Sequence, residues 1–179
     1  MTPTKIKDVF VIEPEVFEDS RGWFTESYNK NKLAEAGIIA VFVQDNRSFT
    51  KKSGTLRGLH LQNKPFTQAK LVSCSQGAVL DVAVDVRTDS PTYRQWVRVE
   101  LSAENKKQLF VPRGFAHGFL TLIDNTVVEY KTDNFYNKAS ERSIRYDDPE
   151  LEIDWGEIDP ILLPRDEQAP FLKNCDIDL

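Results

Sequence analysis

The sequence is poor in the residues that usually build metal sites and covalent crosslinks. Its 179 residues include two cysteines and two histidines. Cys74 and Cys175 lie far apart in the chain, and neither belongs to a paired spacing typical of zinc sites or redox motifs. We therefore expect two reduced thiols that form neither a disulfide nor a metal site.

Long apolar runs and an excess of basic residues are also missing. The longest apolar stretches, such as 78–84 with Asp81 inside it, are too short to span a bilayer. No charged segment followed by an apolar core stands at the N-terminus, so we expect a cytoplasmic protein without a secretory signal. The formal net charge of -5 argues against a general nucleic-acid or membrane-surface binder.

What is present indicates one globular domain over 1–179, since 40% of the residues are hydrophobic and 28% are charged. Short β-prone segments alternate with turn signals, which predicts an all-β sandwich or barrel. A short helix is expected over 29–37, capped by Asn29, and the tail from 147 onwards has irregular or helix-like pieces such as 158–163. The β-prone segments are 9–12, 22–28, 41–43, 70–74, 78–87, 95–101, 108–111, 118–122 and 126–130.

Both histidines lie in short apolar runs beside Arg and Gly, His60 in LRGLHLQ and His117 in PRGFAHGF. On a regular strand Gln62 shares a face with His60, whereas Arg57 joins them only if the strand bends at Gly58. Gln is a weak metal ligand and two histidines do not complete a metal site, so the pattern favours general-base chemistry by His60. A hydrogen-bonded core histidine is the structural alternative.

Other polar and aromatic residues are weaker candidates. Arg21 and Arg57 carry fork-shaped donors suited to phosphate oxygens, although most arginines are simply solvated. Tyr130, at the end of a predicted strand, could donate a proton, but on the residues alone a packing role is more common. The aromatic rings that could stack on a nucleotide base, and that more often belong to a core, are Phe24, Phe119 and Tyr136.

Six blocks in order give the chain a family resemblance over nearly its whole length. They are FEDSRGWFTE (17–26), VQDN (43–46), LRGLHLQ (56–62), QAKLV (68–72), GAVLDVAVD (77–85) and VPRGFAHGF (111–119). In these blocks the chain resembles the dTDP-4-dehydrorhamnose 3,5-epimerases of the cupin superfamily. The run 112–117 is similar to the second cupin motif, while Gln62 departs from the metal-binding first motif as the metal-free epimerases do.

The resemblance implies a cupin-type double-stranded β-helix, or jelly roll, that works without a cofactor or metal. The implied reaction inverts C3 and C5 of dTDP-4-dehydro-6-deoxy-D-glucose through an enolate next to the C4 ketone, in dTDP-L-rhamnose biosynthesis. It also implies a homodimer in which N-terminal strands cross to the partner, so that Arg21 and Glu26 act in the neighbour's site.

The resemblance further assigns roles to residues. It implies that His60 is the general base, that Asp166 is its paired carboxylate and that Tyr130 is the acid. Lys70 is our candidate for the fixed positive charge that the developing oxyanion requires. The expected substrate contacts are Arg21, Glu26, Gln44, Asn46, Arg57, His117, Phe119, Tyr136 and Arg165; the last stands where the family often has Lys.

Three other functions remain open at this point. Close relatives that share the dyad act at C3 or C5 only, on other deoxysugars. A cupin could also bind a sugar nucleotide without turning it over, or be a metal-dependent oxygenase. Product stereochemistry, ligand binding without turnover and metal content separate these alternatives.

Overall fold

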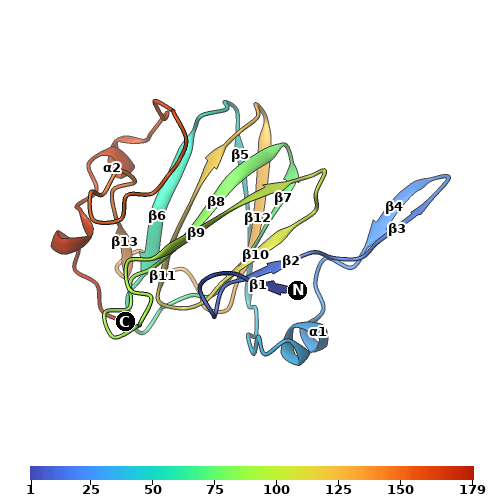
Figure 1. The fold of residues 1–179 in the computed structure, drawn as a ribbon, viewed down its shortest axis with the longest axis horizontal. Coiled ribbons are helices and arrows are strands. Elements are labelled where there is room, and N and C mark those ends of the chain that lie inside the picture. Colours follow the sequence, from blue (N-terminus) through green and yellow to red (C-terminus); the bar gives the residue numbers. More distant parts are fainter.

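The computed structural model describes residues 1–179 and is built from two large antiparallel β-sheets and one separate hairpin (Figure 1). The six-stranded sheet has the order β1-β2-β10-β7-β12-β5, and the five-stranded sheet has the order β13-β6-β11-β8-β9. Strands of the first sheet are β1 (Thr2–Pro3), β2 (Phe10–Ile12), β10 (Gln108–Val111), β7 (Lys70–Gln76), β12 (Thr126–Thr132) and β5 (Gln44–Thr50). Those of the second are β13 (Glu141–Ser143), β6 (Leu56–Gln62), β11 (Phe115–Thr121), β8 (Ala78–Asp85) and β9 (Trp96–Ser102).

The main core lies between the two sheets, because alternate side chains of each strand point inward. Val72 of β7 and Val128 of β12 meet Val79 and Ala83 of β8 there, and all four are fully or almost fully buried. The expectation of an all-β fold with a few short helices is therefore confirmed.

A second core covers the outer face of the five-stranded sheet. Val82 and Val84 of β8 point to this face and pack with Trp155 and Leu172 of the C-terminal segment. This segment, red in Figure 1, runs beside β6 and β13. Its few regular elements are α2 (Pro164–Glu167) and the 3-10 turn η1 (Leu172–Asn174).

The helix expected over 29–37 is confirmed as α1 (Lys30–Glu35). The Asn29 side chain accepts hydrogen bonds from the amides of Asn31 and Lys32, as an N-cap does. Of the two conformations expected for 158–163, helix-like or irregular, the structure has the irregular one. Helix α2 begins only at Pro164, because proline at the first helical position needs no amide partner and its ring presets the backbone angle.

The strand predicted over 41–43 is wrong by a few residues, since β5 begins at Gln44, where pairing with Thr132 of β12 starts. The sequence of β5, QDNRSFT, is polar because the strand lies at the edge of its sheet and alternates between half-buried and exposed positions. Apolar alternation therefore gave no signal for it.

The hairpin of β3 (Val16–Asp19) and β4 (Gly22–Thr25) extends away from both sheets (Figure 1). It leaves large apolar side chains in solvent: Phe17 is 53% exposed, Trp23 is 58% exposed and Phe24 is 68% exposed. Exposed apolar side chains gathered on a projecting element are typical of an interaction surface.

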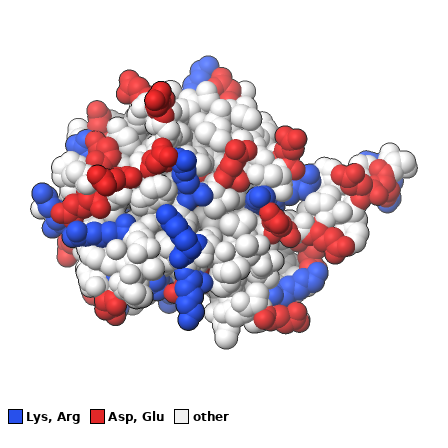
Figure 2. All heavy atoms as spheres, viewed as in Figure 1, with Lys and Arg blue, Asp and Glu red and all other residues white.

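Charges of both signs are interspersed over the face shown in Figure 2, without a broad area of one sign. No helix of the structure has the length and apolar character needed to cross a membrane.

Candidate active site

The two histidines are direct neighbours across paired strands, since His117 of β11 lies opposite His60 of β6. Between His117 and Phe119 of β11 the register shifts, and Phe119 pairs with Arg57 of β6. The shift is a bulge in β6 at Gly58, whose φ is +135°. Because the bulge inserts one residue, Arg57 and His60 face the same side of the strand, so the condition that the sequence set for Arg57 to join His60 is met.

His60 is paired with a buried carboxylate from the C-terminal segment. Its Nε2 lies 2.7 Å from Oδ1 of Asp166, and the two side chains are 20% and 2% exposed. Asp166 belongs to α2, which contacts β6 and so brings the carboxylate to the histidine. With Nε2–H donating to Asp166, the lone pair on Nδ1 is free to accept a proton.

Arg165 and Glu141 extend this pair into a polar network at the cavity mouth. Arg165 Nη2 lies 3.4 Å from His60 Nε2, Nε lies 3.5 Å from Asp166 Oδ1, and Nη1 lies 3.5 Å from Glu141 Oε1. The Tyr136 hydroxyl donates to Glu141 Oε2 at 3.1 Å. Glu141 is not among the residues expected from the sequence, because it lies on the short strand β13 in a polar stretch without a motif.

A cavity of about 250 Å³ opens beside this network. Seven of the thirteen residues proposed from the sequence line it: Gln44, Asn46, His60, Lys70, Tyr130, Tyr136 and Arg165. The other lining residues are Leu61, Gln62, Gln68 and Glu141. Both sheets contribute, since β6 carries His60 and β7 and β12 carry Lys70 and Tyr130.

Lys70 and Tyr130 form the side of the cavity that belongs to the six-stranded sheet. The Lys70 ammonium lies 5.9 Å from the centroid of the Tyr130 ring. Burial lowers the pKa of Lys70 to about 8, against the opposing pull of Asp81 and Glu141. Burial also raises the pKa of Tyr130, with Glu141 adding to the effect, so the phenol stays protonated at neutral pH.

His117 lies behind the cavity, in the core. Its Nε2 is 3.0 Å from both carboxylate oxygens of Asp81, and the side chains are 6% and 0% exposed. Burial lowers the pKa of His117, so the neutral ring donates to Asp81. Phe119 is likewise 5% exposed and belongs to the main core. The structure thus places these two expected substrate contacts inside the barrel, away from the cavity wall.

Gln62 is the residue by which the sequence departs from the metal-binding first cupin motif. Its side-chain amide forms hydrogen bonds to the backbone of loop residues. Its Nε2 donates to the carbonyls of Phe66 at 2.7 Å and Phe135 at 3.1 Å. Its Oε1 accepts from the amide of Asn137 at 2.6 Å. Gln62 therefore joins the loop that follows β6 to the loop that follows β12. The structure contains no group of three or more His, Cys, Asp or Glu side chains placed to hold a metal ion.

Gln44 fixes two of the lining residues. Its Oε1 accepts from the amide of Tyr136 at 3.1 Å, and its Nε2 donates to Asn46 Oδ1 at 2.9 Å. Arg57, which does not line the cavity, donates to Thr50 Oγ1 at 3.1 Å and lies close enough to lower the pKa of Tyr130.

Arg21 and Glu26 lie outside the cavity of their own chain. Arg21, at the tip of the β3–β4 hairpin, pairs with Asp19, and its side chain is 88% exposed. Glu26, at the base of the hairpin, pairs with Lys32 at 2.9 Å. The fold of one chain therefore does not bring these two residues to His60.

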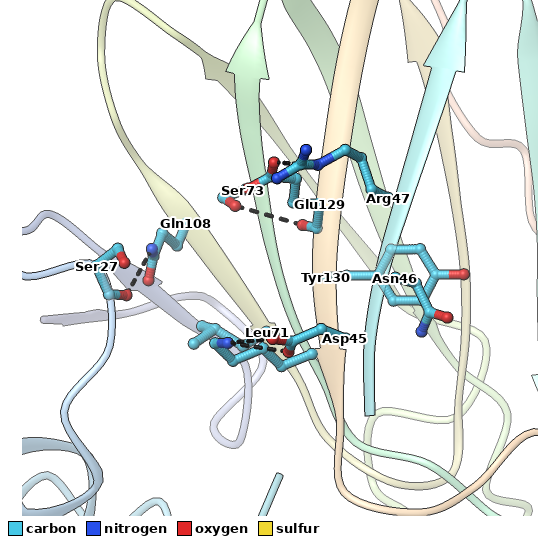
Figure 3. Close-up of a pocket in the computed structure, with 10 residues that line it drawn as sticks. Ser27, Asp45, Asn46, Arg47, Leu71, Ser73, Gln108, Glu129 and Tyr130 are labelled. Atoms are coloured by element: carbon cyan, nitrogen blue, oxygen red, sulfur yellow. Dashed lines mark hydrogen bonds and ion pairs between the residues drawn. The ribbon is translucent and has the colours of Figure 1, made fainter. Parts of the chain in front are cut away.

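A second pocket, of about 350 Å³, lies on the outer face of the six-stranded sheet (Figure 3). Its charges neutralise one another: Arg47 pairs with Glu129 at 2.7 Å, and Lys131 pairs with Asp45 at 2.9 Å. In Figure 3 the Tyr130 ring points to the other side of the strands from Glu129. With no histidine and no unpaired charge among its lining residues, this pocket is a poor candidate for chemistry.

The fold and the first cavity define a class of protein: a cupin-type barrel enzyme whose cavity brings His60 of one sheet together with Lys70 and Tyr130 of the other. Residues 3–174 match the family model described as dTDP-4-dehydrorhamnose 3,5-epimerase, and the chain belongs to this family. The family and the cupin-type fold expected from the sequence are thereby confirmed.

Individual relatives agree with this assignment. The dTDP-4-dehydrorhamnose 3,5-epimerase of Shigella flexneri is 52% identical over 97% of this chain and 96% of the relative. The dTDP-6-deoxy-D-glucose-3,5-epimerase of Legionella pneumophila, solved with dTDP-4-keto-L-rhamnose, has a TM-score of 0.91 and 47% identity, covering 96% of this chain and 92% of that one. A 3'-monoepimerase from Streptomyces bikiniensis, solved with dTDP-quinovose, has a TM-score of 0.89 and 35% identity, covering 97% and 88%.

Proposed function

We propose that the protein inverts C3 and C5 of dTDP-4-dehydro-6-deoxy-D-glucose and so produces dTDP-4-dehydro-L-rhamnose for dTDP-L-rhamnose biosynthesis. The observation that carries the proposal is the His60–Asp166 pair, 2.7 Å apart, in one cavity with Lys70 and Tyr130. Both inversions move protons only, so the reaction needs no redox cofactor.

The first half of each inversion is proton abstraction from the carbon next to the C4 ketone. His60 takes this proton on Nδ1, and the imidazolium that forms is stabilised by Asp166. The electron pair of the broken C–H bond moves to the ketone oxygen and gives an enolate. Lys70 supplies the fixed positive charge for this oxygen, inside a partly desolvated cavity where such a charge acts strongly.

The second half is proton return to the opposite face of the same carbon. Tyr130 is suited to this step because burial keeps its phenol protonated and it belongs to the sheet that faces His60. The enolate collapses to the ketone as Tyr130 gives up its proton. Exchange with solvent then returns a proton to Tyr130 and removes one from His60.

We infer that the active unit is a homodimer in which the β3–β4 hairpin of one chain completes the site of the other. The exposed Phe17, Trp23 and Phe24 on this projecting hairpin support the inference. Arg21 would supply a guanidinium for the diphosphate of the neighbour's substrate, and Glu26 a carboxylate. Arg165 and Tyr136 line the same chain's cavity, and we expect them to contact the substrate there.

We place the enzyme in the cytoplasm. Cys74 and Cys175 are both free thiols in the structure, which suits a reducing compartment. Direct fractionation of cells that produce the protein tests this point.

The experiment that tests the proposed function is the incorporation of deuterium from heavy water into dTDP-4-dehydro-6-deoxy-D-glucose, with a reductase present to trap the product. Label at both C3 and C5, with the L-rhamno configuration, is the expected result. Label at one carbon would identify a single-position epimerase, like the 3'-monoepimerase from Streptomyces bikiniensis. Binding of the sugar nucleotide without any label would identify a non-catalytic binder.

A further inference from the structure

The buried Asp81–His117 pair is not used by the mechanism above. We propose that Asp81 is a positioning residue that keeps Lys70 positively charged inside the barrel, and that His117 holds its carboxylate in place. The inference rests on the proposed function, in which Lys70 stabilises an enolate oxygen.

The strand pattern points Asp81 and Lys70 into the same interior from opposite sheets. Lys70 alternates with Val72 and Cys74 along β7, and both of these belong to the core between the sheets. Asp81 stands between Val79 and Ala83 on β8, which belong to the same core. Since alternate strand residues share a face, the carboxylate and the ammonium both lie between the two sheets.

Neither charged group has a partner of fixed opposite charge within 4.0 Å, and Asp81 acts on Lys70 through space. Asp81 is 0% exposed, and its one hydrogen-bond partner is the ring of His117. A neutral imidazole donates one hydrogen bond and leaves the negative charge uncompensated, which is costly for a buried carboxylate. Lys70 forms neither a hydrogen bond nor an ion pair within 4.0 Å, so its ammonium stays free on the cavity wall.

The charge state of Lys70 depends on this arrangement. Burial lowers its pKa to about 8, and Asp81 is the stronger of the two carboxylates that oppose the decrease, the other being Glu141. The remaining titratable or charged groups that face Lys70 are His117 on β11, His60 on β6, Tyr130 on β12 and Arg165 on α2. Without Asp81, Lys70 would lose its proton closer to neutral pH, and the enolate would lose its cation.

The test is the pH dependence of kcat in Asp81→Asn. Asparagine keeps the size of the side chain and an oxygen for His117, but removes the negative charge. We expect the alkaline limb of the kcat profile to move to lower pH by about one unit, with KM little changed. The matched control is Asp85→Asn, which removes a buried carboxylate of the same strand that is paired with Arg87. This variant should leave the limb at its wild-type position.

Lys70→Arg shows whether the effect passes through Lys70. Arginine stays charged throughout the working range, so Asp81→Asn in this background should not move the limb. The proposal would be overturned if Asp81→Asn left the alkaline limb of the kcat profile at its wild-type pH. It would also be overturned if Asp81→Asn shifted the limb by the same amount in the wild-type and in the Lys70→Arg background.

Two further measurements cover the case in which Asp81→Asn does not fold. His117→Gln retains a donor for Asp81 and should keep the wild-type limb, whereas His117→Phe removes the donor and should shift the limb as Asp81→Asn does. An alkaline limb of the kcat profile at the same pH in these two variants would contradict the proposal. NMR titration of the Lys70 side chain, assigned by its absence in Lys70→Arg, needs no turnover. It therefore tests the charge of Lys70 even if the heavy-water experiment finds no epimerisation.

Discussion

Nε2 of His60 lies 2.7 Å from Oδ1 of Asp166, although 106 positions separate the two residues in the chain. The Asp166 side chain is 2% exposed and comes from α2, in the segment that covers the outer face of the five-stranded sheet. The C-terminal segment therefore provides the carboxylate partner of the proposed base and also contributes to the second core.

Loss of either member of this pair should abolish efficient proton abstraction. We expect His60→Ala to lower kcat by about 10³-fold, and Asp166→Asn by a smaller factor that still exceeds about tenfold, because the amide leaves the imidazolium without its counter-charge. Initial rates with the coupled reductase measure both. Glu167→Gln, on the same helix but exposed, is the control and should be unaffected. Turnover near the wild-type rate in His60→Ala would remove the mechanism.

Tyr130→Phe should separate the two halves of the reaction. The variant keeps His60 and Lys70, so exchange of the substrate proton with heavy water should continue while formation of the L-rhamno product falls by about 10²-fold. Mass and NMR analysis of recovered substrate and product gives both rates. Tyr146→Phe, packed against the second core, should change neither rate. Equal loss of exchange and product would argue against Tyr130 as the acid.

The shared-site homodimer predicts complementation between inactive chains. Mixing His60→Ala with Arg21→Ala chains and allowing subunits to exchange should restore about a quarter of the wild-type sites, because half of the sites in each mixed dimer combine two intact contributions. Mixing His60→Ala with Asp166→Asn should restore nothing, since both changes lie in the same chain's part of the site. Absence of recovery in the first mixture, with subunit exchange demonstrated, would show that the hairpin does not cross.

The bulge at Gly58 should tolerate no side chain. A Cβ there would lie 2.5 Å from Cα of Gly118, in a backbone conformation with φ of +135°. Gly54 also has a positive φ, +72°, but nothing lies within 4 Å of its Cβ position. We expect Gly58→Ala to destabilise the protein by about 2 kcal/mol more than Gly54→Ala does, as measured by urea unfolding. Similar stabilities of the two variants would mean that the bulge can relax.

Asp85 should stabilise the fold in a pH-dependent way. Although its burial acts in the opposite direction, hydrogen bonds from Arg87, Ser90 and Thr92 lower the pKa of Asp85 to about 2. Its contribution is therefore complete above the unfolded pKa of about 4 and disappears as the pH falls through about 2. At pH 7, Asp85→Asn should cost about 2 kcal/mol, and the difference in Tm from wild type should shrink in acid. A difference that is constant down to pH 2 would contradict this origin of the stability.

The alternation of apolar residues was sufficient to find several of the inner strands. The segments predicted over 70–74, 108–111 and 126–130 lie inside β7, β10 and β12, because each of these strands buries side chains in the main core. The same rule could not find β5 or β13, which are edge strands with polar sequences. These strands form because they pair with a neighbouring strand, and the sequence of one segment does not show which segment will pair with it.

The sequence by itself determined the all-β class, the histidine suited to act as a base and, through its six blocks, the family; the resemblance to that family also predicted that His60 pairs with Asp166. Only the tertiary structure decided that Glu141 joins Arg165 at the cavity mouth, that His117 turns to Asp81 in the core, and that the hairpin with Arg21 leaves its own barrel. The reason is physical: strand alternation is a local property, whereas the distance between side chains remote in sequence depends on how sheets, bulges and covering segments pack together.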